Sequence, residues 1–205
     1  MSYRFSLSKQ GRPLRKMLHP AILLLTIFLI TAALPGCTLV RQAFAPEPLP
    51  VLDVRTFDRN VSLRHRVSIT YGERNFTLQT ITERNDDRMV IVGLSSYSTT
   101  LFTIRIHRTS LDVESNADLP LDLERFATDL QWALWPSISE RDGITVQTDE
   151  VDGGIKRTLF RDGGRIGTIT ASKQPPWTGD ITFTRAAGYS MNLSLLTEEP
   201  ISSTP

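Results

Sequence analysis

The sequence is poor in the residues from which enzyme and metal sites are usually built. One cysteine, Cys37, occurs among 205 residues, which excludes an internal disulfide. Three histidines and no second cysteine leave zinc without a recognisable ligand spacing. The sequence also lacks a Gly-x-Ser-x-Gly elbow, a His-Glu-x-x-His helix and a phosphate-binding loop. These absences indicate no enzyme class, so we expect no catalytic residue, no cofactor and no metal.

The N-terminal segment lacks acidic side chains, and its apolar run is too short for a membrane helix. Five of the 23 Lys and Arg residues precede residue 37, and none of the 22 Asp and Glu residues do. Residues 21–34 (AILLLTIFLITAAL) form an apolar run of 14 residues, shorter than the about 20 that a membrane helix needs. This combination is typical of a secretory signal. The remaining chain carries 18 basic and 22 acidic side chains, and such a mildly acidic domain is not expected to bind nucleic acid.

The single cysteine directly follows this apolar run. Leu34, Pro35, Gly36 and Cys37 resemble the lipobox of bacterial lipoproteins. The resemblance implies that residues 1–36 are a signal peptide, that Cys37 is the lipid attachment site, and that acyl chains hold the protein on a membrane. Thr38 is not the aspartate that retains such proteins in the inner membrane, which implies the periplasmic face of the outer membrane of a Gram-negative bacterium. An uncleaved signal anchor with an incidental thiol is the alternative.

The mature chain is expected to contain one folded domain. Residues 37–50 hold three prolines within their last five positions, which favours an extended, semi-rigid tether. Residues 197–205 (TEEPISSTP) are polar and contain two prolines, so we expect a flexible tail. The domain should therefore span residues 51–196.

Within that domain the main hydrophobic period is two, which predicts β-strands. Val61, Leu63, His65 and Val67 alternate with polar residues, and Asp-Gly-Gly turns follow at 152–154 and 162–164. The pattern predicts eight or nine strands in antiparallel hairpins, from the segments 61–71, 75–84, 88–94, 101–113, 144–151, 155–161, 165–172, 179–185 and 189–196.

One helix is predicted between the fourth and fifth strands. Apolar residues recur at spacings of three and four over residues 123–134, acidic residues stand near the start, and Pro136 follows the end. We expect an α+β, mainly antiparallel fold, an open or half barrel with this one clear helix on its concave face. The pattern leaves open whether the interior is filled by side chains or encloses an apolar cavity.

The order of these features carries a second resemblance. A lipobox, four strands, a helix ending in residues 130–136 (LQWALWP), and hairpins closing at Gly188 and Tyr189 resemble an uncharacterised family of small bacterial lipoproteins related to LolA and LolB. LolA and LolB are the carrier and the outer-membrane acceptor of lipoproteins, and the resemblance implies a LolB-like half barrel whose apolar cavity takes acyl chains. It also implies partners in lipoprotein sorting or lipid export, because relatives are often associated with aryl polyene lipid production.

Two groups of site residues follow from these expectations. The candidate cavity lining comprises Val67, Ile69, Phe102, Ile104, Phe126, Leu130, Trp132 and Trp135. In LolB an apolar side chain on a loop between early strands contacts the membrane, and the resemblance implies this role for Tyr97 in the loop at residues 95–100.

The sequence leaves three functional hypotheses. The first is a lipid-anchored monomer that binds an acyl chain or lipidated cargo and helps to carry or insert it. The second is a structural or docking lipoprotein of an envelope complex. The third is a lipid-modifying enzyme, for which His65, His107 or the carboxylate pairs Glu150 with Asp152 and Asp112 with Glu114 are the only candidates. A buried histidine or a solvated charge pair is the more common explanation of such residues.

Overall fold

The computed structural model describes residues 47–185 and 188–201. The chain divides into two units at the junction of Ala45 and Pro46, and the described residues all belong to the second. Leu34, Pro35, Gly36 and Cys37 lie outside the described residues, so the lipobox stays a prediction.

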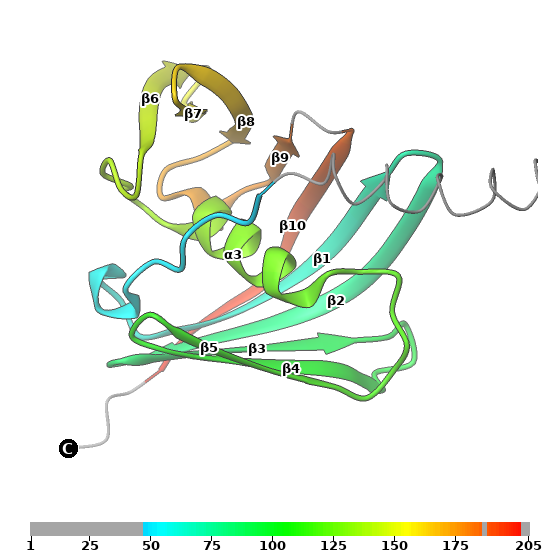
Figure 1. Cartoon of the computed structure of the whole chain (residues 1–205). Helices are drawn as coiled ribbons and strands as arrows, with labels where there is room; N and C mark the ends of the chain where they lie inside the picture. Colours follow the sequence, from blue (N-terminus) through cyan, green and yellow to red (C-terminus); the bar gives the residue numbers. More distant parts are fainter. Residues whose placement is uncertain (1–46, 186–187, 202–205) are drawn as a thin grey trace, which may run out of the picture. The chain divides into compact units, whose positions relative to one another are not determined.

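The second unit is built on one antiparallel sheet of ten strands that curves around a single α-helix (Figure 1). The strand order is β5-β4-β3-β2-β1-β10-β9-β8-β7-β6, so the sheet is open between β5 and β6. The strands are β1 (Val61–Tyr71), β2 (Arg74–Asn85), β3 (Arg88–Leu94), β4 (Thr100–His107), β5 (Ser110–Ser115), β6 (Ile144–Val151), β7 (Gly154–Arg161), β8 (Gly164–Ala171), β9 (Ile181–Arg185) and β10 (Tyr189–Pro200). The predicted open half barrel of mainly antiparallel strands is confirmed.

Strand β1 lies at the centre of the sheet, between β2 and β10. Its residues Val61, Leu63, His65 and Val67 are buried, and the side chains between them are partly or fully exposed. The period-two pattern therefore gave the correct buried face, because successive side chains of a strand point to opposite sides.

Strand β10 continues beyond its predicted end. Its final residues pair with the start of β1, in the register Val61↔Pro200 to Arg64↔Thr197. The predicted flexible tail at 197–205 is therefore wrong as far as Pro200, and the predicted domain boundary at Leu196 falls inside a strand. Pairing uses backbone groups, so polar side chains such as Glu198 did not prevent it.

The predicted strand at residues 101–113 is two strands. Strands β4 and β5 are joined by a turn at Arg108 and Thr109, where Arg108 has a φ of 55°. Arginine rarely adopts this left-handed conformation, and no glycine or proline marks the turn. The structure therefore has ten strands in its sheet, where the sequence pattern indicated eight or nine.

The helix α3 (Leu123–Leu134) has the predicted bounds. Asp122 caps its start by accepting a hydrogen bond from the Arg125 backbone N–H at 3.0 Å. Every residue from Phe126 to Leu134 is buried, although an amphipathic helix usually exposes one face.

The burial of the second face is due to residues 47–57, which we call the strap. The strap crosses α3 on the side away from the sheet (Figure 1) and contains the 3₁₀ helix η2 (Val54–Thr56). The Gln131 side chain accepts from the Leu52 N–H at 2.7 Å and donates to the Leu52 carbonyl at 2.8 Å. The Trp132 indole N–H donates to the Pro50 carbonyl at 2.8 Å. Residues 47–50 were predicted to belong to the tether, but Leu49 is buried and this end of the tether is part of the domain.

Candidate functional site

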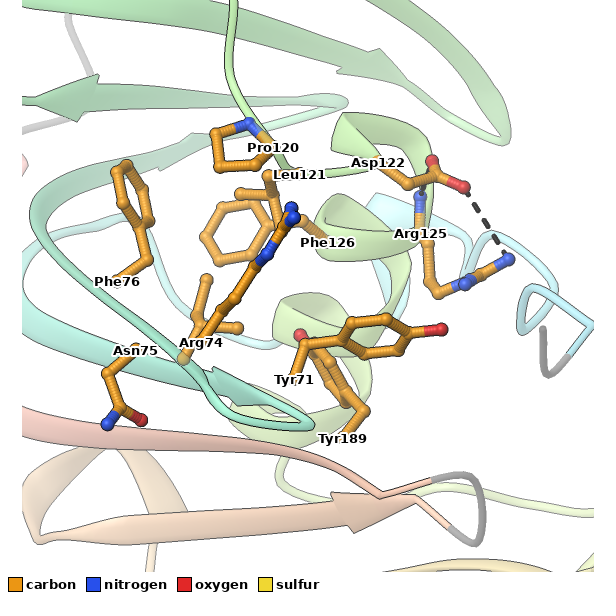
Figure 2. A pocket seen from close by; sticks show the side chains of 11 residues that line it. Tyr71, Arg74, Asn75, Phe76, Pro120, Leu121, Asp122, Arg125, Phe126 and Tyr189 are labelled. Carbon is orange, nitrogen blue, oxygen red and sulfur yellow. Dashed lines mark hydrogen bonds and ion pairs between the residues drawn. The ribbon is translucent and has the colours of Figure 1, made fainter. Parts of the chain in front are cut away.

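A cavity of about 510 Å³ lies where the β1–β2 hairpin, the start of α3 and the start of β10 meet (Figure 2). Pockets of about 300 to 1,000 Å³ are typical of small-molecule sites. The lining consists of Ile69, Tyr71, Arg74, Asn75, Phe76, Pro120, Leu121, Asp122, Arg125, Phe126 and Tyr189.

The inner part of this cavity is apolar. Ile69 and Phe76 are register partners on the concave side of β1 and β2, and Leu121 and Phe126 face them from the α3 side (Figure 2). The ring of Phe126 is held by an edge-to-face contact with Phe102, with centroids 5.6 Å apart. This arrangement can remove an apolar group from water without rearranging the core.

The rim of the cavity carries two arginines and one carboxylate. Arg125 forms an ion pair with Asp122, with Nη2 and Oδ2 3.5 Å apart. The Nε of Arg125 is buried and has no hydrogen-bond partner within the described part of the chain. The Arg74 side chain extends from the hairpin toward the α3 side of the cavity (Figure 2). The charges on this rim therefore sum to one net positive charge.

Tyr189 contributes an unpaired polar atom to the wall. The residue is 5% exposed, and its hydroxyl has no hydrogen-bond partner among residues 47–185 and 188–201. Burial is the main reason that the pKa of Tyr189 is raised above its ordinary value. A buried hydroxyl without a partner usually costs about 1 to 3 kcal/mol, so this group is available to a ligand that brings an acceptor.

A buried ion pair lies beneath this wall, between α3 and β9. Arg185 Nη1 and Asp129 Oδ1 are 2.6 Å apart, and both side chains are almost fully buried. Arg185 also donates to the carbonyl of Glu47 in the strap. Desolvation outweighs the attraction of Arg185 and raises the pKa of Asp129 to about 7. The pair therefore joins the strap, the helix and the sheet.

The structure separates the eight predicted lining residues into two groups. Ile69 and Phe126 line the cavity. The other six are at most 1% exposed, belong to the packed core and do not line it: Val67, Phe102, Ile104, Leu130, Trp132 and Trp135. Trp132 and Trp135 are buried against the strap, where the Pro50 carbonyl and the Thr56 hydroxyl accept hydrogen bonds from their indole N–H groups.

The most distinctive sequence feature, the Trp-Pro helix end, serves packing. The Trp135 indole N–H donates to Thr56 Oγ1 at 2.8 Å. The Trp135 and Phe57 rings pack edge-to-face, with their centroids 5.0 Å apart. Arg157 donates to the carbonyls of Trp135 and Pro136. These contacts fix the helix end against the strap and β7.

A second hollow, of about 600 Å³, lies beside these carbonyls. It is lined by a mixture of polar and apolar groups, including Thr148, Glu150 and Pro175. The Arg157 guanidinium is already engaged with backbone carbonyls, so this hollow offers a ligand less than the first cavity does.

Tyr97 lies at a loop, as predicted, and is 91% exposed. Ser95 Oγ accepts hydrogen bonds from the backbone N–H groups of Tyr97 and Thr99, both at 3.2 Å. The loop is therefore organised and presents a single aromatic side chain. Its role in membrane contact stays a prediction.

The candidate catalytic residues lie on different strands, with His65 in β1, His107 in β4, and Asp112 and Glu114 in β5. His65 is fully buried in β1, and desolvation lowers its pKa to about 4. His107 is on the surface, with Nε2 2.9 Å from Asp87 Oδ2. Arg105 pairs with both members of the Asp112 and Glu114 set, at 3.7 and 3.1 Å.

Two further observations concern the described residues alone. They contain no group of three or more His, Cys, Asp and Glu side chains suited to a metal ion. None of the helices within 47–185 and 188–201 combines the length and apolar character needed to cross a bilayer.

Sequence reasoning missed most of the cavity lining. Tyr71, Arg74, Asn75 and the segment 120–122 come from a hairpin tip and a helix start. From the sequence alone these residues are explained by the hairpin turn or by the start of the helix. Only the fold brings them together. Gly188 and Tyr189 are part of the resemblance to the lipoprotein family, but nothing in the sequence indicates that Tyr189 lines a cavity.

Comparison of the sequence with curated proteins finds no match. Among solved structures, the chain is similar to a LolA superfamily protein from Nitrosomonas europaea, at 8% identity and a TM-score of 0.44, over 74% of this chain and 92% of that chain. It is similar to a domain named as an outer membrane lipoprotein-sorting protein from Vibrio parahaemolyticus, at 7% identity and a TM-score of 0.43, over 72% and 87%. A DUF1329 family protein from Desulfovibrio piger matches at 9% identity and a TM-score of 0.33, over 74% and 90%. At these TM-scores the similarities assign no function to this chain.

The comparison with family models gives a match of greater weight. Residues 62–197 match the family described as "Protein of unknown function (DUF3261)". This region runs from β1 into β10 and includes α3 and all of the cavity lining. Because the match covers more than half of the sequence, the chain belongs to this family of proteins of unknown function.

Proposed function

We propose that the protein binds an acyl chain, alone or as part of a lipidated ligand, in the cavity of about 510 Å³ and helps to carry or insert it. The observation that carries the proposal is the apolar inner wall formed by Ile69, Phe76, Leu121 and Phe126 beside a polar rim. Burial contributes about 0.8 kcal/mol per methylene, so each methylene that fits the cavity strengthens binding about three- to fourfold. The role needs no catalytic group.

The test uses a chain that starts at Thr38, because a start at Val51 would remove Leu49 and Pro50 from their contacts with the domain. A fluorescent acyl probe should bind one saturable site, and long-chain lipids should displace it better than short ones. Phe76→Glu should weaken binding about tenfold or more, since it places a charge in the apolar wall. The matched control is Thr77→Glu, on the exposed side of the same strand. Equal binding by both variants, with both folded, would place the probe elsewhere.

Transfer is a separate property and needs its own measurement. Donor protein loaded with the probe should deliver it to liposomes, and Tyr97→Ser should slow delivery without weakening binding if the exposed ring contacts the bilayer. Unchanged delivery by this variant would remove Tyr97 from the proposal and leave probe binding intact.

The proposed location is the bacterial envelope, with Cys37 as the lipid-bearing residue. Cys37→Ser should abolish incorporation of a clickable fatty acid into the full chain and leave the precursor uncleaved. Labelling of the serine variant at the level of the unchanged protein would contradict the lipobox. Membrane fractionation alone is not decisive, because the apolar run at 21–34 can hold an uncleaved precursor at the membrane.

A docking lipoprotein of an envelope complex is the second candidate function. It is favoured by the filled interior, since six of the eight predicted cavity residues are packed core. Absence of saturable probe binding by a folded domain would support this candidate over the carrier.

A further inference from the structure

The cavity has a polar end whose chemistry indicates more than an acyl chain. Arg74 and Arg125 stand on the lining, and Asp122 is the only acidic residue there. Asp129 and Arg185, behind the wall, form a pair with each other, and because the pKa of Asp129 is raised, this pair adds no net negative charge. The electrostatic environment of the rim is therefore positive, which favours an anionic group.

Two groups at this end can donate hydrogen bonds that they do not make within the described residues. Arg125 Nε and the Tyr189 hydroxyl are buried and have no partner within the described residues. The Tyr189 hydroxyl points into the space enclosed by the lining side chains (Figure 2). A carboxylate or phosphate oxygen accepts several such bonds at once and binds guanidinium groups more strongly than a neutral oxygen does.

We propose that the ligand is an anionic amphiphile, a single acyl chain whose carboxylate or phosphate is held by Arg74, Arg125 and Tyr189 while its tail lies along Ile69 and Phe76. This inference rests on the proposed function, because it assigns the head of the ligand whose tail occupies the same cavity. The same chemistry is present in a free fatty acid and in a lysophospholipid with a terminal phosphate.

The experiment compares two photoactivatable probes of equal chain length, a palmitate analogue and the corresponding hexadecanol analogue. Each is added to the full chain in micelles of an uncharged detergent, and labelled peptides are identified by mass spectrometry. The palmitate probe should label the peptides that contain residues 69–76 and 120–126 about tenfold more than the alcohol probe, as expected for charged hydrogen bonds to guanidinium groups.

Two variants and a control connect this preference to the rim. Arg74→Gln combined with Tyr189→Phe should reduce the preference to about twofold or less, and it should leave labelling by the alcohol probe unchanged. Arg66→Gln is the matched control, because Arg66 is an exposed arginine on the opposite face of β1. Arg125 is kept in the first variant because it also pairs with Asp122 beside the start of α3, and Arg125→Gln is measured separately.

The outcomes separate the two proposals. Equal labelling of the cavity peptides by both probes, unaffected by the variants, would overturn the anionic head and leave the acyl site intact. Labelling of neither set of peptides above the level found elsewhere in the chain would overturn both. A competition experiment identifies the preferred head group. Unlabelled palmitate and palmitoyl lysophosphatidate compete with the palmitate probe, and the stronger competitor shows whether the carboxylate or the phosphate is preferred. Competition by hexadecanol equal to both would also contradict the inference.

Discussion

The two ends of α3 lie in different surroundings within one domain. The part from Ala127 to Leu134 is enclosed by the sheet on one side and the strap on the other. The N-terminal turn, with Leu123 and Arg125 only partly buried, borders the cavity. The comparison shows that a short covering segment decides which part of a curved sheet is core and which part is left hollow. Packing should therefore be costly to disturb at one end and cheap at the other.

The largest effect is expected at the buried ion pair of the packed end. Asp129→Ala leaves Arg185 charged and without its partner in the interior, which should cost about 3 to 5 kcal/mol of unfolding free energy. The double variant Asp129→Leu with Arg185→Met should cost less than the single variant, since no charge is left buried. Urea unfolding of the three proteins measures this. A double variant less stable than Asp129→Ala would show that the pair contributes net stability.

The second comparison uses leucines at the two ends. Leu130 is fully buried, so Leu130→Ala should cost about 2 to 5 kcal/mol. Leu121 is partly buried beside the cavity, and Leu121→Ala should cost about 1 kcal/mol or less but weaken acyl probe binding. Equal losses of stability would contradict the distinction between a packed end and a hollow end.

A pH effect should also come from the packed interior. The native state holds His65 neutral, with its pKa lowered to about 4 by burial, whereas the unfolded chain has the ordinary value near 6.5. Between these values the unfolded state binds more protons at this side chain, so the contribution of His65 to stability is lost as the pH falls from about 6.5 to 4, by about 3 kcal/mol at most. The raised pKa of Asp129 acts in the opposite direction over the same range, so the comparison with a His65 variant isolates the histidine. Denaturant unfolding of the protein and of His65→Leu should show a steeper loss in the protein with histidine. Parallel pH profiles would contradict this role.

The smallest effect is expected at the rim of the cavity. Arg74 is exposed and has no ion pair among the described residues, so Arg74→Gln should change the unfolding free energy by less than about 0.5 kcal/mol. A thermal melt checks this directly. A loss above 1 kcal/mol would show that Arg74 supports the fold. The ligand preferences of Arg74→Gln and Arg66→Gln would then be compared under conditions in which both variants are equally folded.

Sequence patterns determined the strands and the helix in which the polarity of each side chain matches its burial. The alternation at 61–71 gave the bounds and the buried face of β1, because one face of this strand was turned to the core. The spacing at 123–134 gave the bounds of α3 but not the burial of its second face. The open antiparallel half barrel was predicted from strand patterns and from turn residues such as Gly153 and Gly163, which have positive φ values in the structure. Membership of an uncharacterised family was also predicted, and the family match confirms it.

Only the tertiary structure decided where the interior is filled. The strap reaches α3 across about 80 residues of sequence, through Gln131 and Leu52, and no local pattern indicates which distant segment covers a helix. The strap buried Trp132 and Trp135, which had been assigned to a cavity, and left the hollow at the hairpin tip instead. The polarity of a side chain can be read from the sequence. A cavity is the space left between segments that come together only on folding, so the sequence does not locate it.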